Sequence, residues 1–237
     1  MPTNNKNKSV LFFSPHPDDH FSAAGTIFKL KEKGYDYYEV LFANGETGGH
    51  LGKTQVDPNE LRGIRSLEFE KASVLFGTKK YYKLNIPNND IHYTRDLMFE
   101  LIKIIREVRP SLAIIPHTTD YHRDHREVSE ISADALLRAD NSFALHLGER
   151  YRVPVILQCR GINPLLKIDM LVDISEQYSK VLDLVEIYNS QVTPRMLQYV
   201  ESLPSLSGYY MRAKYAEEFE IPRNLPIIPN DVLADLA

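Results

Sequence analysis

The sequence predicts an α/β protein with a doubly wound, mostly parallel sheet and helices on both faces, which is a Rossmann-like three-layer sandwich. Two observations predict this class. Short apolar runs that favour strands alternate with longer segments whose apolar residues recur at helical spacing. The intervals between the runs are long enough for helical crossovers, which join parallel strands. Residues 1–237 suffice for one sizeable core, so we expect a single domain.

The first predicted unit is a strand, a loop and a helix. Residues 10–13 form the strand, and residues 22–33 carry apolar side chains at helical spacing up to Gly34. The unit repeats along the chain. The other predicted strands are 39–43, 80–84, 112–115, 155–159 and 170–172, and the other predicted helices are 60–76, 95–108, one capped by Ser175 and one starting at Thr193-Pro194.

Two finer expectations concern packing. The helix predicted over 60–76 should bury one apolar face, made of Leu61, Ile64, Leu67, Ala72 and Leu75. The Pro-rich tail from about residue 220 should run along the surface.

The composition limits the partners and the location. Hydrophobic residues make up 43% and charged residues 25%, as in ordinary folded proteins, and the net charge of −4 predicts no binding to nucleic acid or membranes. Cys159 is the only cysteine, which excludes intrachain disulfides and thiolate metal cages. The polar start and the short apolar run after it predict neither a signal peptide nor a membrane span. We expect a cytoplasmic protein, and a homo-oligomer is open.

Three predicted loops leave the same edge of the sheet. They comprise residues 15–20, 44–59 and 116–125, and each follows a predicted strand. In doubly wound sheets, ligands bind outside the carboxyl ends of the strands. We therefore expect the functional site at this edge. The Gly-rich stretch 44–52 should face the substrate, since it lacks the spacing and the lysine of a P-loop.

The first and third loops are rich in histidine and aspartate. Residues 15–20 read Pro-His-Pro-Asp-Asp-His, and residues 120–125 read Asp-Tyr-His-Arg-Asp-His. Either cluster alone could be a helix-capping loop. Two clusters at the ends of strands in one sheet favour a metal site, because catalytic zinc is held by three nitrogen and oxygen donors with one position open to water. Such a site makes hydroxide available near neutral pH.

The two clusters resemble the signatures of the LmbE-like (PIG-L) family of N-acetylglucosaminyl deacetylases, a His-Pro-Asp-Asp loop after the first strand and a later His-x-Asp-His loop. The similarity spans about Val10 to Phe219. Its further motifs are Asn44-Gly45-Glu46 with Gly48, Arg65 with Glu68, Val108-Arg109-Pro110, Val172-Asp173-Ile174-Ser175, Ser190-Gln191 and Glu218-Phe219. The resemblance implies a hydrolase that removes the acetyl group from a small N-acetylated amino sugar.

The resemblance also implies roles for single residues. The ligands of one Zn²⁺ per chain would be His16, Asp19 and His125. Asp18 would act as general base, taking a proton from the attacking water and returning it to the departing amine. His122 would stabilise the tetrahedral oxyanion as an imidazolium, and Asp124 would pair with it and favour that charged form.

Candidates for substrate contacts lie in the same loops and in the helix after the second loop. Glu46, Arg65 and Asp120 could hold sugar hydroxyls, and Tyr121 is the best-placed aromatic residue near the site for a substrate contact. Arg65 could instead form only an ion pair with Glu68, and Tyr121 could be a packed core residue.

Two positions depart from the family pattern. The family usually has Glu where this chain has His20, and Pro where it has Arg123. Neither replaces an expected ligand or the base. His20 could support the metal site from behind the ligands, which we favour, or face solvent. Arg123 could contact a negative group on the substrate, although an exposed loop arginine is the simpler reading.

Other functions are open. The same chemistry could cut a non-sugar acyl amide or a thiol conjugate. Clusters of His and Asp also build two-metal phosphoesterases, with ions about 3.5 to 4 Å apart. A binding protein that kept the fold without the chemistry is the third alternative.

Overall fold

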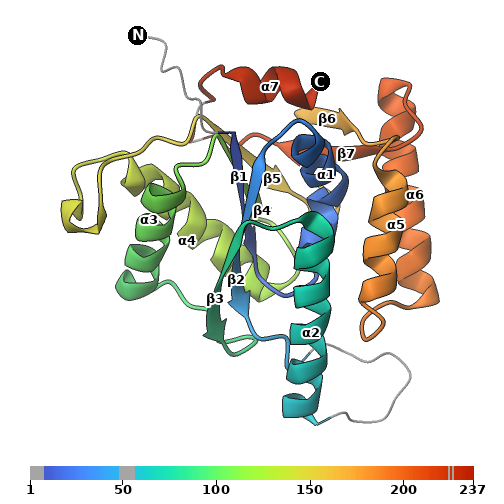
Figure 1. Ribbon diagram of the computed structural model, residues 1–237, viewed down its shortest axis with the longest axis horizontal. Coiled ribbons are helices and arrows are strands. Elements are labelled where there is room, and N and C mark those ends of the chain that lie inside the picture. The colour runs from blue at the N-terminus through green and yellow to red at the C-terminus, as the bar shows by residue number, and fades with distance from the viewer. Residues whose placement is uncertain (1–7, 48–56, 224, 226) are drawn as a thin grey trace.

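A seven-stranded sheet crosses the middle of the protein, with helices on both of its faces (Figure 1). The computed structural model describes residues 8–47, 57–223, 225 and 227–237. The strands are β1 (Ser9–Ser14), β2 (Asp36–Ala43), β3 (Lys80–Ile86), β4 (Leu112–Pro116), β5 (Val155–Cys159), β6 (Met170–Asp173) and β7 (Ala216–Glu220). Their order across the sheet is β3-β2-β1-β4-β5-β7-β6. Strands β1 to β5 pair in parallel, and only β7 runs against its neighbours among the described strands, so the predicted doubly wound, mostly parallel fold is confirmed.

The helices divide between the two faces of the sheet. They are the 3-10 helix η1 (Asp19–Ala23), α1 (Ala24–Glu32), α2 (Pro58–Phe76), α3 (Arg95–Val108), α4 (Arg123–Ala139), the 3-10 helix η2 (Leu145–Leu147), α5 (Tyr178–Ile187), α6 (Pro194–Met211) and α7 (Asp231–Leu236). In β1, Val10 and Phe12 belong to the core with α1, α2, α5 and α7, whereas Leu11 and Phe13 belong to the core with α3 and α4. Because side chains alternate along a strand, the sheet is the middle layer of three.

Helix α2 shows how local sequence sets the bounds of an element. The Asp57 carboxylate accepts the free backbone amides of Asn59 (2.9 Å) and Glu60 (3.2 Å), and Pro58 occupies the first turn, where its missing N–H costs nothing. At the other end, Gly77 adopts a left-handed conformation with φ of 60°. The helix therefore begins and ends where a cap residue replaces the missing helical hydrogen bonds.

Most predicted elements lie within a few residues of the observed ones. The predictions of a helix over 95–108 and a strand over 155–159 are confirmed residue for residue as α3 and β5. The first helix begins later than predicted, because residues 19–23 form η1 before α1.

Two local predictions are wrong. Ser175 does not cap a helix, since its hydroxyl donates to Asp173 (2.6 Å) and accepts from the backbone amide of Tyr215 (3.1 Å), which joins the end of β6 to the start of β7. Helix α5 begins three residues later, at Tyr178. Leu67, expected on the buried face of α2, is 60% exposed, and Arg65, Glu68 and Phe69 are buried instead.

The described residues of the Pro-rich part of the C-terminal tail are mostly partly or fully exposed, as predicted, but the helix that follows them is anchored in the core. Helix α7 places Val232 and Leu236 in the core beside α1, each about fully buried. Strand β7, just before the tail, was not predicted because Glu217 and Glu218 interrupt its apolar pattern. The end of the chain therefore contributes to the core.

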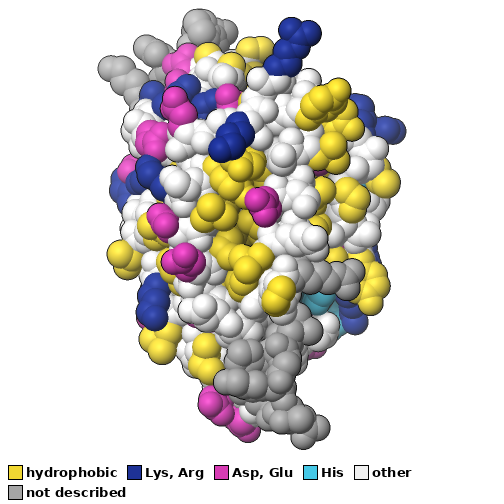
Figure 2. All heavy atoms as spheres, turned by 90° about the vertical axis from the view of Figure 1, so that its right-hand side faces the viewer, with side chains coloured by type: hydrophobic (Ala, Val, Ile, Leu, Met, Phe, Trp, Pro, Cys, Tyr) yellow, Lys and Arg dark blue, Asp and Glu magenta, His cyan; other side chains and the backbone are white. Residues whose placement is uncertain are grey.

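The outer surface of α5 and α6 carries many apolar side chains. Figure 2 shows hydrophobic side chains gathered on the face that these helices form. The exposed side chains of the two helices include Leu182, Leu197, Leu206, Tyr209 and Tyr210. No helix in the described part of the chain combines the length and the apolar composition that crossing a membrane requires.

Gly25 in α1 should be sterically essential, whereas Gly63 in α2 should not. A Cβ at Gly25 would lie 2.7 Å from Ile174 atoms, and a Cβ at Gly63 would meet nothing within 4 Å. We expect Gly25→Ala to destabilise the fold by about 1–3 kcal/mol through overpacking. Gly63→Ala should stabilise it by about 0.5–1 kcal/mol through helix propensity. Urea unfolding measures both, and equal shifts of the same sign would contradict the packing argument.

Candidate active site

Five loops at the carboxyl edge of the parallel strands surround one cavity of about 660 Å³. The loop after β1 contributes His16, Asp18 and Asp19, and the loop after β4 contributes His122 and His125. The cavity is also lined by Thr47 after β2, Asn88 after β3 and Arg160 after β5. The expectation that the functional residues meet at this edge agrees with the structure.

Three of the expected side chains come together as a set of metal donors. His16 Nδ1 and His125 Nε2 lie 3.3 Å apart, although the residues are 109 positions apart in the chain. The Asp19 carboxylate lies between them, 3.0 Å from His16 Nδ1 and 3.2 Å from His125 Nε2. Donors bound tetrahedrally to zinc at about 2.0–2.1 Å are themselves about 3.3 Å apart. The spacing and the chemistry of these donors therefore fit a tetrahedral metal ion.

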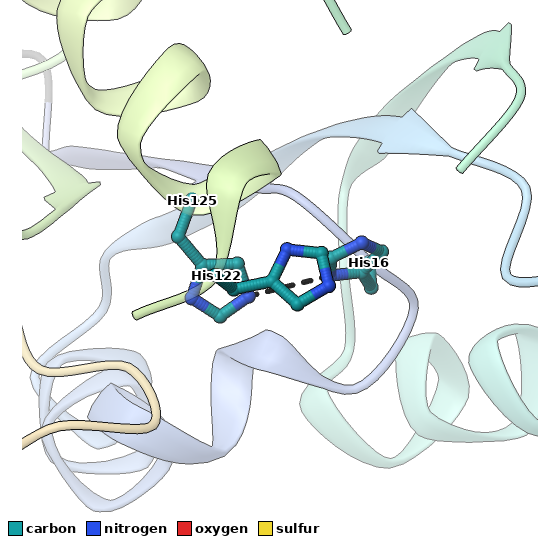
Figure 3. Close-up of side chains that lie close together, drawn as sticks. All are labelled: His16, His122 and His125. Carbon is teal, nitrogen blue, oxygen red and sulfur yellow. Dashed lines mark hydrogen bonds between the residues drawn. The ribbon is translucent and has the colours of Figure 1, made fainter. Parts of the chain in front are cut away.

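His122 stands beside this set. Figure 3 shows the imidazoles of His16, His122 and His125 gathered together, and the three histidines offer nitrogen atoms within 4.8 Å of one another. The ring centroid of His122 lies 4.7 Å from that of His16 and 5.0 Å from that of His125. The structure therefore offers two candidate ligand sets. Both contain His16 and His125, and the third ligand is Asp19 in one set and His122 in the other.

Each shared histidine is held from behind by a buried carboxylate. His16 Nε2 lies 3.1 Å from Asp124 Oδ2, and His125 Nδ1 lies 3.4 Å from Asp120 Oδ1. Such carboxylates orient metal-binding imidazoles and fix their tautomers. Gly161 is required here because a Cβ would lie 2.2 Å from the Asp120 carboxylate and 2.5 Å from His125 Nδ1.

The observed contacts of Asp120 and Asp124 differ from the roles expected for them. Asp120, expected to hold a sugar hydroxyl, uses its second oxygen to accept the backbone amide of Ile162 at 2.8 Å, and it does not line the cavity. Asp124, expected to pair with His122, pairs with His16 and also accepts the backbone amide of Asn89 at 2.8 Å.

The charges of the site favour a cation. Burial alone would lower the pKa of His16, but the carboxylates of Asp19 and Asp124 outweigh it and raise that pKa to about 9. Burial is likewise outweighed at His125, where Asp19 and Asp120 raise the pKa to about 10. Burial alone would raise the pKa of Asp19, but His125 and His16 hold it well below its usual range. A positive metal ion between these groups would replace the bound protons.

The hydrogen bonding of His122 fits a neutral ring rather than the expected imidazolium. Burial, followed by the neighbouring His16 and His125, lowers its pKa. Its Nδ1 accepts the backbone amide of Asp124 at 3.1 Å, as the N-cap of α4. A neutral ring that accepts at Nδ1 carries its proton on Nε2. His122 can therefore donate one hydrogen bond in the cavity as a neutral imidazole.

Asp18 is placed apart from the metal donors and is anchored by Arg65. Arg65 Nη2 donates to Asp18 Oδ1 at 2.5 Å, and Nη1 donates to the Gly45 carbonyl at 3.2 Å. Glu68, the alternative partner of Arg65, instead accepts from the backbone amide and hydroxyl of Ser190. Asp18 and Arg65 both line the cavity, so the carboxylate is held in place while it faces the space for a substrate.

The remaining candidates lie outside the cavity. Glu46 accepts the backbone amide of Asn88 at 2.6 Å and so holds a residue that does line it. Tyr121 is 77% exposed, which contradicts the core alternative, and it does not line the cavity. Arg123 is exposed and contacts His92 and Glu127.

His20 is fully buried, so the alternative in which it faces solvent is wrong. Gly48 and the stretch of the second loop beyond Thr47 up to residue 56 lie outside the described residues.

Sequence reasoning missed several cavity residues. Asn88, Arg160, Gln191, Met196 and Tyr199 line the cavity from loops and from α6. Ser190-Gln191 was noted as part of the family pattern, but nothing in the sequence near the other four indicates that they reach the site. Their positions depend on how the C-terminal helices fold back over the sheet edge.

Comparison with known proteins gives the chain its class. A family model described as GlcNAc-PI de-N-acetylase (PIG-L) matches residues 11–136. The diacetylchitobiose deacetylase of Thermococcus kodakarensis is 31% identical over 226 residues, which are 90% of this chain and 82% of that protein. A structure of the N,N'-diacetylchitobiose deacetylase of Pyrococcus horikoshii, complexed with an inhibitor, has a TM-score of 0.82 at 26% identity and covers 96% of this chain and 89% of its own.

A fourth comparison concerns the fold alone. The 4-carboxy-2-hydroxymuconate hydratase of Pseudomonas putida has a TM-score of 0.76 at 20% identity, covering 94% of this chain and 99% of its own. Fold and site together define a metal-dependent amide hydrolase, an N-deacetylase. The chain belongs to the GlcNAc-PI de-N-acetylase (PIG-L) family, so the resemblance found in its sequence is confirmed.

Asp124→Asn should weaken metal binding without removing a ligand. The carboxylate holds the ring of His16, and loss of such a partner typically lowers metal affinity about 10- to 100-fold. Chelator competition with Zn²⁺ as the probe measures the dissociation constant. Asp140→Asn, at the exposed C-terminus of the same helix, is the matched control and should bind as the parent does. Parental affinity in Asp124→Asn would refute the supporting role.

Proposed function

We propose that this protein hydrolyses the acetamide of a small molecule that contains N-acetylglucosamine, with one zinc ion held by His16, Asp19 and His125. The observation that carries the proposal is the Asp19 carboxylate lying between His16 and His125 while Asp18 stays free of both and faces the cavity. The deacetylases of Thermococcus and Pyrococcus named above act on diacetylchitobiose, which supports a sugar acetamide as substrate.

The proposed ligands are two imidazole nitrogens and one carboxylate, a set that is common for catalytic zinc and leaves a position open. A bound zinc ion would activate water and polarise the acetamide carbonyl. The remaining steps belong to the side chains around it. Asp18 would take the proton of the attacking water and give it to the nitrogen of the leaving amine.

His122 would stabilise the negative charge that develops on the acetamide oxygen. Its Nε2 proton follows from the N-cap bond at Nδ1, and the residue lines the cavity. A fixed hydrogen-bond donor that meets charge only in the transition state accelerates the reaction, and removal of one such donor typically costs about 10²–10³ in kcat.

The cavity also supports a substrate larger than one sugar ring. Its volume of about 660 Å³ lies within the range of about 300–1,000 Å³ that holds drug-sized ligands. Arg65 and Asn88 contribute polar groups to its lining, and Phe21 and Met196 contribute apolar surface. We expect a second group, joined to the N-acetylated sugar, to occupy this additional space. The homo-oligomer and the cytoplasmic location stay predictions.

The zinc-loaded protein should release acetate from N-acetylglucosamine, from diacetylchitobiose or from an alkyl or aryl glycoside of N-acetylglucosamine. Asp18→Asn should keep its zinc and lose about 10²–10⁴ in kcat, because it removes the base and leaves the ligands. Acetate release and zinc content per chain measure the two properties. No acetate from any of these compounds with one zinc bound would refute the proposed substrate class, and unchanged turnover in Asp18→Asn would remove Asp18 as the base.

Two variants distinguish the candidate ligand sets. Asp19→Ala should lose bound zinc, since it removes one of three ligands. His122→Gln should keep one zinc per chain while kcat falls about 10²–10³, since only the oxyanion donor is altered. Metal analysis after dialysis, together with acetate release, separates these outcomes. Loss of zinc from His122→Gln with retention in Asp19→Ala would assign the three-histidine set instead.

A further inference from the structure

A chain of buried hydrogen bonds ends on the backbone just before the proposed base. The Tyr188 hydroxyl donates to the carbonyl of Pro17 at 2.5 Å, and the same oxygen lies 2.8 Å from His20 Nε2. His20 Nδ1 lies 3.0 Å from Glu39 Oε1, and the other Glu39 oxygen accepts the Tyr37 hydroxyl at 2.9 Å. The Pro17 carbonyl and the Asp18 amide form one peptide unit, so this chain acts on the backbone that carries Asp18.

This chain of hydrogen bonds is buried away from water. His20, Glu39 and Tyr188 are fully buried. The aromatic rings of Phe69 and Phe76 stand around His20, with centroids 6.1 and 4.9 Å from its own. Buried polar groups inside an apolar shell keep a single arrangement, because any other arrangement leaves one of them without a partner.

The hydrogen bonds of this buried network can be followed from Pro17 to Glu39. Tyr188 has one hydroxyl proton, and at 2.5 Å the Pro17 carbonyl receives it. On the other side of the Tyr188 oxygen lies His20 Nε2, and the second ring nitrogen, Nδ1, lies against the Glu39 carboxylate. Both ring nitrogens therefore have a partner, as does every other polar atom along this line from Glu39 to Pro17.

This arrangement explains the departure at His20. The family usually has Glu at this position, and here a Glu would face the buried carboxylate of Glu39 with no donor between them. Two carboxylates cannot both stay ionised in such a place. His20 instead places one ring nitrogen against Glu39 and the other against the Tyr188 hydroxyl, so a histidine at this position is compatible with the buried acid on β2.

A residue of α2 also holds the segment that carries Tyr188 in place. Ser190, two residues later, donates its backbone amide (2.8 Å) and its hydroxyl (2.6 Å) to the buried Glu68. Glu68 lies one helical turn from Arg65, which binds the Asp18 carboxylate directly. Helix α2 therefore fixes both the side chain of Asp18 and the tyrosine that fixes its backbone.

We propose that Tyr188, supported by His20 and Glu39, is a positioning residue for catalysis: it fixes the Pro17–Asp18 peptide so that the Asp18 carboxylate stays in its productive position. This inference rests on the proposed role of Asp18 as general base. It assigns a function to the one departure from the family pattern inside the first signature loop. A small displacement of a catalytic carboxylate lowers the rate of the chemical step more than the binding of substrate.

The test compares two tyrosines of the same region that each donate to a backbone carbonyl. Tyr178 lies at the start of α5, is buried, and donates to the carbonyl of Val200 at 3.4 Å, away from the loop that carries Asp18. Tyr188→Phe should lower kcat at least tenfold with KM and zinc content at parental values. Tyr178→Phe should keep kcat within twofold of the parent. Acetate release, zinc content and thermal unfolding are measured for the parent and both variants.

The outcomes separate the two levels of inference. Release of no acetate by the parent would refute the proposed function, whereas an active parent with parental kcat in Tyr188→Phe would overturn only the positioning role. A fall in kcat accompanied by loss of zinc would also overturn it, because Tyr188 would then support the ligands rather than the base.

A second variant covers the case in which Tyr188→Phe does not fold. Glu39→Gln keeps the shape of the side chain and removes the charge that orients His20, and it should lower kcat severalfold at parental KM and zinc content. Adding Tyr188→Phe to Asp18→Asn provides a further measurement. The double variant should be no slower than Asp18→Asn alone if Tyr188 acts through Asp18, and independent, multiplying losses would overturn the inference.

Discussion

The site depends on one interaction, the Asp19 carboxylate that lies between the imidazoles of His16 and His125. The two histidines are far apart in the sequence, and they meet only because β1 and β4 are neighbours in the sheet, paired from Val10 with Leu112 onward. The crossover helices that make these strands parallel also bring their carboxyl ends to one edge. The geometry of the site therefore depends on the packing of the core, since a change that separates β1 from β4 also separates His16 from His125.

Most of the fold could be predicted from the sequence, because strands buried on both faces must be apolar throughout and helices must show one apolar side. Strand β5 and helix α3 follow these patterns closely. Strand β7 does not, because Glu217 is buried to accept the backbone amides of Gly25 and Thr26 at the start of α1. A carboxyl group that serves as the cap of a distant helix carries no local sign of that use, so periodicity alone misses the strand.

The sequence predicted which residues form the candidate metal site, but not which carboxylate contacts which histidine. The two His- and Asp-rich loops indicate which residues meet, whereas the direction of each carboxylate depends on geometry that sequence does not contain. Asp124 stands two residues from His122, yet only its backbone amide serves that ring, and its carboxylate turns to His16. Sequence proximity suggested the pair of Asp124 and His122, which is wrong. In the first turn of a helix, the backbone amide of a residue can bond to the N-cap side chain while the residue's own side chain points elsewhere.

The fold alone does not determine the reaction, since a hydratase shares it over nearly the whole chain. The proposed hydrolysis depends in addition on Asp18, a carboxylate that lines the same cavity as the candidate metal donors without joining them. Arg65 holds the side chain of Asp18, and Tyr188 holds the peptide before it. Both anchors lead back to α2, through Arg65 itself and through Glu68 and Ser190. The position of the proposed base is therefore set by a helix that supplies no metal ligand, which is why residues far from the ligands in sequence should control the rate.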